Sequence, residues 1–465
     1  MTEAAIARNG PTQTGGREAT TGHIAGDCVI AVGMPDTPAP PGWRWRLLTE
    51  LARLESGHTP SRRHPEYWDG DISWIGIRDA TANHGRTLQE TEQHATQEGI
   101  NNSSARVLPT NTVCLSRTAS VGYVVVMGKP MATSQDFVNW VCNPEILDYR
   151  YLKYALLAEG TSYSRFSHGT THQTIYFPEV KAFHLCAPHR DTQSTIADVL
   201  SALDDKIEQN RRTAHALERL ARANFRSWFV DFEPVKAKAA GATAFPSMPQ
   251  LVFDALPTSF DEAAIGPVPE GWEVKAIGDV VTTKGGGTPS TKNADYWDGG
   301  EHCWATPKDM SRLTHPVLLD TERRITDAGV DAISSGVLPA GTVLMSSRAP
   351  IGYLAIAGVP TAINQGFIAM VCDGPLPPTY VLNWAFASMD AIKAHASGTT
   401  FPEISKKSFR PLPVVVPPPD VIAAYQEAAD PLFDLLTACV KESEQLGAMR
   451  DYLLPKLLSG DIRVN

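Results

Sequence analysis

The stretch that decides the fold is IADVLSALDDKIEQNRRTAHALERLARANFRSW, residues Ile196–Trp228. Steps of four and three alternate along it, through Ile196, Leu200, Leu203, Ile207, Asn210, Ala214, Leu217, Ala221, Asn224 and Trp228. This spacing is a heptad seam, which predicts a helix that packs along its length against another helix. At the rise of an α-helix the stretch is roughly 50 Å long. The rest of the chain must therefore supply its partner.

Composition sets broad limits on the fold and on the kinds of partner. The chain has 465 residues and a net charge of −10, which predicts two to four domains and no general basic field for nucleic acid. Its seven cysteines are scattered and form no CxxC pair, so a reducing cytoplasm is expected. No apolar run approaches the roughly 20 residues that span a bilayer, so no membrane contact is expected. Residues 1–40 are rich in Gly, Thr, Ala and Pro, and we expect a flexible N-terminal tail there.

Residues 41–190 precede the helix and have a mixed pattern. Short apolar runs bounded by turn residues predict strands at Thr112–Leu115, Tyr123–Met127 and Phe137–Cys142, and a helix is expected at Tyr149–Ala158. The long helix is expected over 191–233, with Asp191 as an acceptable N-cap. Residues 234–268 are rich in Pro and Gly, which predicts a linker without a core of its own.

The chain then repeats itself. Gly271-Trp272 repeats Gly42-Trp43, and Tyr296–Gly299 repeats Tyr67–Gly70, both at an offset of 229 residues (272 minus 43, and 296 minus 67). Gln365 answers Gln135 at 230. The unit is too long for a solenoid repeat, so the pattern indicates a tandem duplication. We call residues 41–190 the first repeat and residues 269–419 the second repeat.

The duplication includes the helix, and so provides its partner over 420–460, followed by a short tail at 461–465. The offset of 229 carries the seam onto Tyr425, Ala429, Leu432, Leu436, Cys439, Ser443, Leu446, Arg450, Leu453 and Leu457. Pro431 is tolerable in a first turn, whereas Pro455 should end or kink the last turn. If Asn210 and Asn224 are buried on the seam, they would fix the register of the two helices. The alternative is that both asparagines face solvent. The residues expected to join the helices or to dock partners are Leu200, Leu203, Ile207, Asn210, Leu217, Asn224, Trp228, Leu432, Leu436, Leu446, Leu453 and Leu457.

A search for enzyme motifs finds no catalytic set. Residues 284–288 read Lys-Gly-Gly-Gly-Thr but lack the spacing of a phosphate loop, so a turn is favoured over a backbone approach to phosphate. Pro178–Lys181 has no acidic partner for a nuclease site, and Asp204-Asp205-Lys206 is most simply a solvated helix face. The histidines and cysteines show no metal-ligand spacing. We therefore expect neither a catalytic residue nor a metal.

Several polar residues occupy matching places in the two repeats and are candidate contacts to DNA. An arginine can fork onto guanine or phosphate, and a glutamine amide suits an adenine edge, although surface or structural roles are about as common. The two repeated Tyr-Trp-Asp-Gly clusters can stack on bases, but core packing is favoured there. The Gly-Thr-Thr loops near each repeat's end suit either turn chemistry or phosphate contact. The candidates are Arg78, Arg117, Gln135, Thr170, Thr171, Lys284, Lys308, Arg348, Gln365, Thr399 and Thr400.

This layout resembles the specificity subunit of type I restriction–modification systems. The resemblance rests on the paired Gly-Trp and Tyr-Trp-Asp-Gly motifs and on the segments Ser347–Tyr353, Ile363–Phe367, Phe225–Phe232 and Leu453–Gly460. It extends over about Gly42 to Val464. One departure is Ser134-Gln135-Asp136-Phe137, where the family has an Asn-Gln-Gly-Phe type of sequence, which puts the role of that loop in question.

The resemblance implies an α+β fold, with two mixed α/β target-recognition domains separated by two long antiparallel coiled-coil helices. Each domain would read one half of a split, asymmetric sequence in double-stranded DNA. The helices would set the spacing and dock two modification subunits, which bind S-adenosylmethionine and methylate adenine. Restriction subunits would add ATP- and Mg-dependent translocation and cleavage, so this chain would bind no cofactor itself. A different reading is a stand-alone scaffold whose repeats bind protein or glycan.

Overall fold

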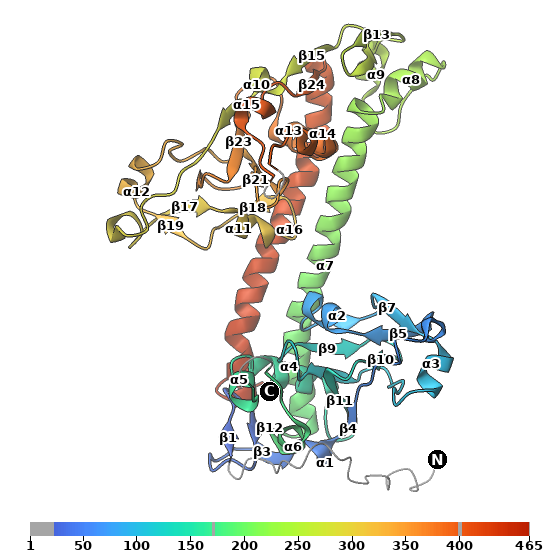
Figure 1. Cartoon of the computed structure of the whole chain (residues 1–465), viewed down its shortest axis with the longest axis vertical. Helices are drawn as coiled ribbons and strands as arrows, with labels where there is room; N and C mark the ends of the chain where they lie inside the picture. Colours follow the sequence, from blue (N-terminus) through green and yellow to red (C-terminus); the bar gives the residue numbers. More distant parts are fainter. Residues whose placement is uncertain (1–22, 170–172, 399–401, 465) are drawn as a thin grey trace. The chain divides into compact units, whose positions relative to one another are not determined.

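The structure is a computed structural model that describes residues 23–169, 173–398 and 402–464. It divides into two units, which are described separately. Unit 1 comprises residues 1–206 and 446–465, and unit 2 comprises residues 207–445. Each unit therefore holds one repeat and a part of both long helices (Figure 1).

Unit 1 is built on three sheets. Its strands are β1 (Ile24–Ala25), β2 (Ile30–Val32), β3 (Arg44–Leu47), β4 (Ala52–Ser56), β5 (Trp68–Ile75), β6 (Thr87–Leu88), β7 (Gln93–Ala95), β8 (Val113–Ser116), β9 (Val124–Met127), β10 (Ala132–Thr133), β11 (Phe137–Cys142) and β12 (Phe183–Ala187). Its short helices are α1 (Leu48–Leu51), η2 (Pro65–Tyr67), α2 (Ile77–Ala82), α3 (Gln97–Asn101), α4 (Tyr149–Ala158), α5 (Tyr163–Phe166) and α6 (Phe177–Lys181). The sheets have the orders β4-β11-β8-β9-β6, β10-β5-β7 and β1-β2-β12-β3.

Unit 2 contains the second repeat and the segment before it. Its strands are β13 (Phe260–Ala263), β14 (Gly266–Pro269), β15 (Glu273–Ala276), β16 (Thr282–Lys284), β17 (His302–Ala305), β18 (Val317–Leu318), β19 (Arg324–Ile325), β20 (Val343–Ser346), β21 (Leu354–Ala357), β22 (Thr361–Ile363), β23 (Phe367–Val371) and β24 (Pro413–Val416). Its short helices are α8 (Glu233–Ala239), α9 (Gln250–Ala255), α10 (Ile277–Val280), η3 (Ala294–Tyr296), α11 (Pro307–Ser311), α12 (Asp327–Asp331), α13 (Pro378–Ala387), α14 (Met389–Ala394) and α15 (Lys406–Phe409).

The two repeats have the same topology, as the sequence duplication predicts. The five-stranded sheet β16-β23-β20-β21-β18 matches β4-β11-β8-β9-β6 strand for strand, and β19-β17-β22 matches the second sheet. Local signals are duplicated too. Thr96 caps α3 by accepting from the Gly99 N–H, and Thr326 caps α12 by accepting from Gly329. The strands predicted at Thr112–Leu115, Tyr123–Met127 and Phe137–Cys142, and the helix at Tyr149–Ala158, are confirmed.

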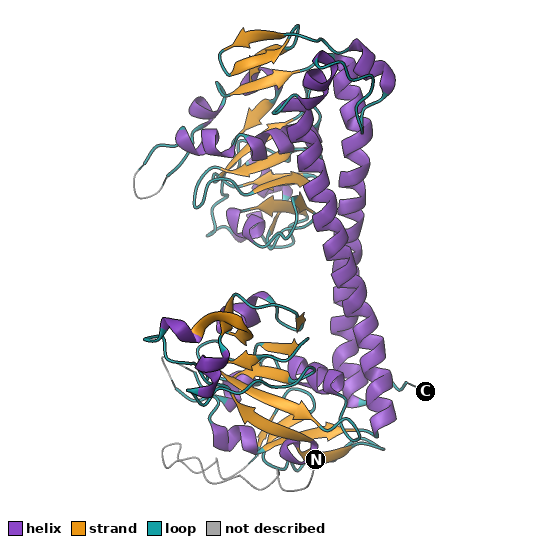
Figure 2. Ribbon diagram, turned by 90° about the vertical axis from the view of Figure 1, so that its right-hand side faces the viewer, coloured by secondary structure: helices purple, strands orange, loops and turns teal. Residues whose placement is uncertain are grey.

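The two long helices are α7 (Arg190–Phe229) and α16 (Pro419–Ser459), which lie side by side in each unit (Figure 1). In unit 1 Leu200 and Leu457 share one core, and in unit 2 Ala214 shares another with Leu436. Later residues of α7 thus meet earlier residues of α16, so the helices run antiparallel as predicted. Figure 2 colours both helices purple beside the orange strands of each repeat. Within the described residues, no helix has the length and apolarity that crossing a membrane requires.

The expectation of a flexible tail over 1–40 is wrong for its described part. Strand β2 is fully buried and pairs with β12, and β1 pairs with β2. The physical reason is the buried Glu159, whose carboxylate accepts backbone N–H groups from Cys28, Val29 and Ile30 at 2.7–3.0 Å. A carboxylate that replaces several strand-type hydrogen bonds is not visible as a sequence pattern.

Two further expectations need correction. Pro431 and Pro455 both lie inside α16, neither in a first turn nor at an end, because the helix begins at Pro419 and continues to Ser459. A proline removes one backbone donor, and both prolines lie on exposed positions of the helix. The expected linker over 234–268 is folded, because it contains α8, α9, β13 and β14. As expected, it has no separate core, since Val235 and Phe253 are buried in the core that the rest of unit 2 also forms.

Candidate nucleic-acid interface

A threonine–glutamine contact is duplicated at one edge of each repeat. In the first repeat the Thr59 hydroxyl donates to the Gln135 Oε1, and in the second repeat Thr288 donates to the Gln365 Oε1 at 2.5 Å. Both glutamines are exposed. The contact holds each amide by its oxygen, so the amide N–H groups are the donors available to a ligand. Sequence comparison identified the glutamines but not the threonines that orient them.

One glycine in each repeat explains the glycine-rich residues 284–288. A Cβ on Gly57 would lie 1.8 Å from the Ser134 carbonyl oxygen, and one on Gly286 would lie 1.9 Å from that of Ile363. Any side chain would therefore push apart the loop that carries the glutamine. Glycine at this position is needed for close backbone packing, which supports the turn interpretation over a phosphate loop.

The candidate arginines Arg117 and Arg348 are not structurally equivalent. The Arg117 N–H donates to the Asp136 carbonyl at 2.7 Å, and the matching bond of the second repeat comes from Ser347, which donates to Gly366 at 2.8 Å. Arg348 instead lies one residue further along. The sequence agrees with this match, because the offset of 230 pairs Arg117 with Ser347. Both segments carry an arginine, but at different positions.

The two arginines also have different surroundings. The Arg117 guanidinium carbon lies 4.9 Å from the centre of the Phe177 ring, and burial lowers the pKa of Arg117 while the Asp136 carboxylate opposes that shift. Arg348 is 39% exposed and lies 4.0 Å from the Glu403 carboxylate. At the position of Phe177 the second repeat has Lys406, at the offset of 229. The repeats thus present different chemistry on the same framework.

Arg78 and Lys308 are paired in the same way in both repeats. Arg78 lies 3.4 Å from the Glu92 carboxylate, and Lys308 lies 2.9 Å from that of Glu322. The backbone N–H of each glutamate is in turn held at 2.8 Å by the aspartate after the cation, Asp79 or Asp309. These exposed pairs are weak, so the cations remain available for exchange onto phosphate.

The Tyr-Trp-Asp-Gly clusters build aromatic pairs rather than free stacking platforms. Trp68 meets Trp74 edge to face at 5.1 Å, and Trp297 meets Trp304 at 5.0 Å. An arginine covers the outer ring of each pair, Arg62 at 3.8 Å and Arg323 at 3.5 Å. These two arginines do not correspond by the repeat offset, which is why sequence comparison missed them.

A buried acid of the first repeat contacts His168, which precedes Gly169. The Glu179 side chain has no exposed surface and lies 3.3 Å from the His168 Nε2. At the offset of 229 the second repeat has Ser397 and Ser408 in place of the pair. The candidates Thr170, Thr171, Thr399 and Thr400 lie outside the described residues. Lys284 is exposed at the end of β16.

The seam of the long helices carries one buried amide. Asn210 is 3% exposed, and its Nδ2 donates to the Glu442 Oε2 at 2.7 Å in unit 2. Asn224 is half-buried, so neither asparagine simply faces solvent. Of the other expected helix contacts, Leu200, Trp228, Leu436 and Leu457 are buried, and Leu203, Ile207, Leu217, Leu432, Leu446 and Leu453 are half-buried.

Asp204 differs from the solvated helix face that its sequence suggests. Its carboxylate accepts from the Tyr154 hydroxyl at 2.7 Å, from Lys153 at 3.1 Å and from Arg450 of α16 at 3.0 Å. Although burial raises the pKa of Asp204, these partners hold it below its ordinary value. The side chain therefore ties α4, α7 and α16 together within unit 1.

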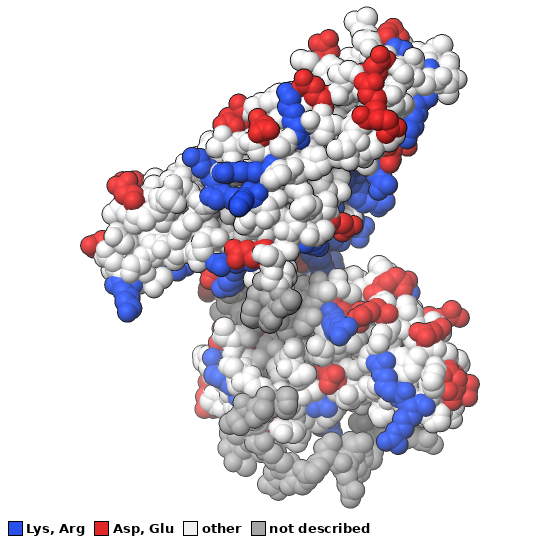
Figure 3. Space-filling view, turned by 45° about the horizontal axis from the view of Figure 1, so that its top comes forward, with Lys and Arg blue, Asp and Glu red and all other residues white. Residues whose placement is uncertain are grey.

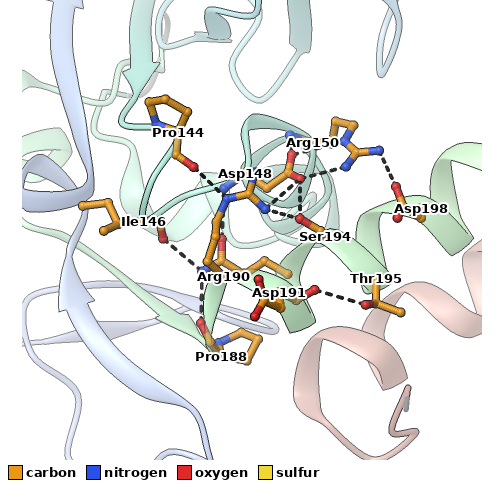
Figure 4. A network of polar contacts seen from close by, with 11 residues as sticks. Pro144, Ile146, Asp148, Arg150, Pro188, Arg190, Asp191, Ser194, Thr195 and Asp198 are labelled. Carbon is orange, nitrogen blue, oxygen red and sulfur yellow. Dashed lines mark hydrogen bonds and ion pairs between the residues drawn. The ribbon is translucent and has the colours of Figure 1, made fainter.

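A second polar network fixes the start of α7 (Figure 4). The buried Asp148 caps α4 and lies 2.8 Å from Arg150 and 3.2 Å from Arg190, while Arg150 reaches Asp198 at 2.6 Å. A cavity of about 510 Å³ lies beside this network. Both arginines that line it are paired with Asp148, so the network anchors the helix rather than offering a free cationic site. Among the described residues, no His, Cys, Asp or Glu cluster is arranged to hold a metal ion.

Comparisons with known proteins place this geometry in a family. The family model "Type I restriction modification DNA specificity domain" matches residues 40–219 and again residues 269–444. The chain is 24% identical over 432 residues to the type I restriction enzyme MjaIX specificity subunit of Methanocaldococcus jannaschii, covering 91% of this chain and 94% of that protein. It is 27% identical over 336 residues to the HindI specificity subunit of Haemophilus influenzae, covering 64% of this chain and 72% of that protein.

A solved structure has the same fold. The S subunit of a type I restriction–modification system from M. genitalium matches with a TM-score of 0.57 at 16% identity, covering 89% of this chain and 96% of that one. The two family matches coincide with the two repeats and include most of α7 and part of α16. The chain belongs to the type I restriction modification DNA specificity domain family.

Proposed function

We propose that this chain reads double-stranded DNA as the specificity subunit of a type I restriction–modification complex, each repeat recognising one half of a bipartite, asymmetric target. The observation that carries the proposal is one framework with different side chains at equivalent places. Arg117 lies over Phe177 in the first repeat, and the matching positions of the second repeat hold Ser347 and Lys406. Two different readers on one scaffold fit two different half-sites.

The Thr59–Gln135 and Thr288–Gln365 pairs are the proposed base readers. A glutamine amide reads a base edge in the major groove when its orientation is fixed. The threonine hydroxyl supplies that fixed orientation in each repeat. The proposed contacts to phosphate or guanine are Arg78, Arg117, Lys308 and Arg348. Four threonines are proposed as phosphate contacts from the sequence alone: Thr170, Thr171, Thr399 and Thr400.

The long helices are the proposed docking surface for two modification subunits. Exposed large apolar side chains lie on both helices: Val199, Leu220, Leu435, Met449 and Tyr452. Leu220 and Met449 correspond by the repeat offset of 229. Exposed apolar side chains along a helix pair suit partner helices. The duplication gives two equivalent places for two copies of one partner.

In this proposal the partner subunits carry out methylation and cleavage, and the complex works in the cytoplasm. Modification subunits would bind S-adenosylmethionine and methylate adenine, and restriction subunits would use ATP and Mg for translocation and cleavage. The net charge of −10 is compatible with DNA binding if the partners neutralise much of the phosphate charge. A neighbouring adenine-methyltransferase reading frame is expected in the genome, and its absence would favour the scaffold for protein or glycan.

The experiment is a DNA-binding titration with and without co-purified modification subunits. We expect the chain alone to bind weakly, and the complex to bind a specific sequence and to show steep salt dependence. Tight, sequence-specific binding by the isolated chain would contradict the idea that partner subunits neutralise much of the phosphate charge. A complex that binds no DNA at low salt would contradict the proposal as a whole.

A further inference from the structure

The second repeat carries three exposed lysines at positions where the first repeat has no cation. Figure 3 shows Lys and Arg side chains gathered on the face of unit 2 that it displays. Lys284 ends β16, and Lys406 and Lys407 begin α15. A Cβ on Gly285 would lie 3.1 Å from the Lys406 Nζ, so this ammonium lies directly over the residue next to Lys284. We call Lys284, Lys406 and Lys407 the lysine patch.

The patch adjoins the proposed reading edge of the second repeat. Gly285 precedes Gly286, whose backbone packs against Ile363 at the end of β22, two residues before Gln365. Behind the patch, the Arg410 Nε donates to the Thr283 Oγ1 at 2.6 Å, which adds a fourth positive charge. A phosphate backbone that places a base before Gln365 would therefore pass close to several cations.

Within the described part of unit 2, none of the three lysines forms an ion pair. Two acids of unit 2 have other polar partners. Asp373, whose pKa is lowered by its hydrogen bond with Thr282 and in part by Lys284, accepts from the Thr282 hydroxyl at 2.6 Å. Glu403 lies 4.0 Å from Arg348. The lysines thus retain their charge for an external anion.

The equivalent surface of the first repeat has a different charge. The offset of 229 matches Lys284 with Glu55, and Lys406 and Lys407 with Phe177 and Pro178. Glu55 is buried and forms ion pairs with two exposed arginines, Arg53 and, at 2.8 Å, Arg106. The positions of the three lysines thus hold an acid, an aromatic residue and a proline in the first repeat. The shared fold therefore does not require the lysine patch.

We propose that the lysine patch binds the DNA phosphate backbone and makes the second repeat the main electrostatic anchor of the chain on DNA. The proposal rests on the proposed function. Lysines act on phosphate as point charges without reading sequence. The second repeat would then hold DNA in a salt-dependent manner, whereas the first repeat would depend more on its direct contacts.

The test compares two lysine pairs in the complex with modification subunits. Lys406→Gln/Lys407→Gln removes two patch charges, and Lys236→Gln/Lys275→Gln removes two exposed charges elsewhere in unit 2, one of them paired with Glu273. The probe is random-sequence duplex DNA several helical turns long, titrated over a range of salt concentrations. Each lost phosphate contact lowers the slope of log affinity against log salt by about 0.9.

We expect the patch variant to lose about 2 units of slope and the control variant to match the wild type. Lys284→Gln added to the patch variant should lower the slope further. The methylated sequence should stay the same in every variant, because phosphate contacts carry no sequence information. Equal slopes for patch and control variants would overturn the patch while leaving the proposed function intact. A wild-type complex that fails to bind DNA would overturn both.

Discussion

The Asn210 side-chain amide donates a 2.7 Å hydrogen bond to the Glu442 carboxylate in the seam between α7 and α16 of unit 2. Asn210 is buried and lies one helical turn before Ala214, which shares a core with Leu436 and Cys439. A buried amide in a heptad seam lowers stability but penalises every register that leaves it without a partner. This contact therefore specifies how the two helices pair.

The first prediction separates the register role of this pair from its stability. Asn210→Leu alone should lower the free energy of unfolding by about 1–3 kcal/mol, because Glu442 loses a buried donor. Asn210→Leu with Glu442→Leu should recover that loss or exceed it, because an apolar pair suits the seam. Urea unfolding of the single and double variants checks this. A double variant less stable than the single one would show that the pair is needed for packing itself.

A second prediction concerns the segment before the first repeat. Glu159→Ala should destabilise unit 1 by about 3 kcal/mol or more, because the backbone N–H groups of Cys28, Val29 and Ile30 lose a charged acceptor. Urea unfolding measures the change, with the exposed Glu145→Ala as the control, expected within about 0.5 kcal/mol of wild type. A small effect at Glu159 would mean that β1 and β2 add little to the fold.

A third prediction follows from Asp27. Hydrogen bonds from Thr161 and Arg165 lower its pKa from 3.8 to about 2. A carboxylate with a lowered pKa stabilises the fold above the unfolded-state pKa, and this contribution is lost as the pH falls through the folded-state pKa. The stability difference between wild type and Asp27→Asn should therefore be constant near neutral pH and shrink from about pH 4 toward about pH 2. A difference that stays constant across that window would contradict the assignment.

Much of this architecture is present in the sequence, because the duplication and the heptad are periodic signals. The strand runs of the first repeat appear where their patterns indicate. The helix caps Thr96 and Thr326 are local too, since each accepts from a residue three positions on. Features that depend on distant partners could not be predicted. Glu159 reaches residues 129 to 132 positions away, and Asp204 meets Arg450 across 246 positions.

The candidate site also combines features that the sequence predicts with features that only the structure shows. The repeat offset identified Gln135 and Gln365. In the structure each glutamine accepts a hydrogen bond from a matching threonine, so the two have the same local surroundings. The offset of 230 pairs Arg117 with Ser347, and the matching backbone bonds of these two residues agree with it. Arg62 and Arg323 cover equivalent tryptophans from non-equivalent positions. Spatial equivalence without sequence equivalence requires the structure.

A fourth prediction tests the proposed readers separately. Gln135→Ala should relax recognition in one half of the target only, and Gln365→Ala in the other half only. Loss of an amide contact to a base edge costs about 1–3 kcal/mol of discrimination, which is about tenfold or more. Competition binding against targets changed in one half measures this. The exposed Gln97→Ala is the control and should change neither half.

A fifth prediction concerns the spacing of the half-sites. Inserting one heptad after Ala214 should lengthen the unread spacer while both half-sites stay the same, because we propose that the long helices set the separation of the two repeats. A matched heptad inserted in α16 after Cys439, whose side chain shares a core with Ala214, should preserve the pairing of the seam. An unchanged spacer in both variants would mean that the helices only pack.

The central claim is that each repeat reads its own half of one split DNA sequence. It is tested most directly by methylome sequencing of a host that expresses this chain with its modification subunits, before and after residues 43–190 are replaced by the matching segment of a relative. The account predicts a bipartite, asymmetric methylated sequence in which the replacement changes one half and leaves the other half unaltered. No chain-dependent methylated sequence, or a replacement that changes both halves, would contradict it.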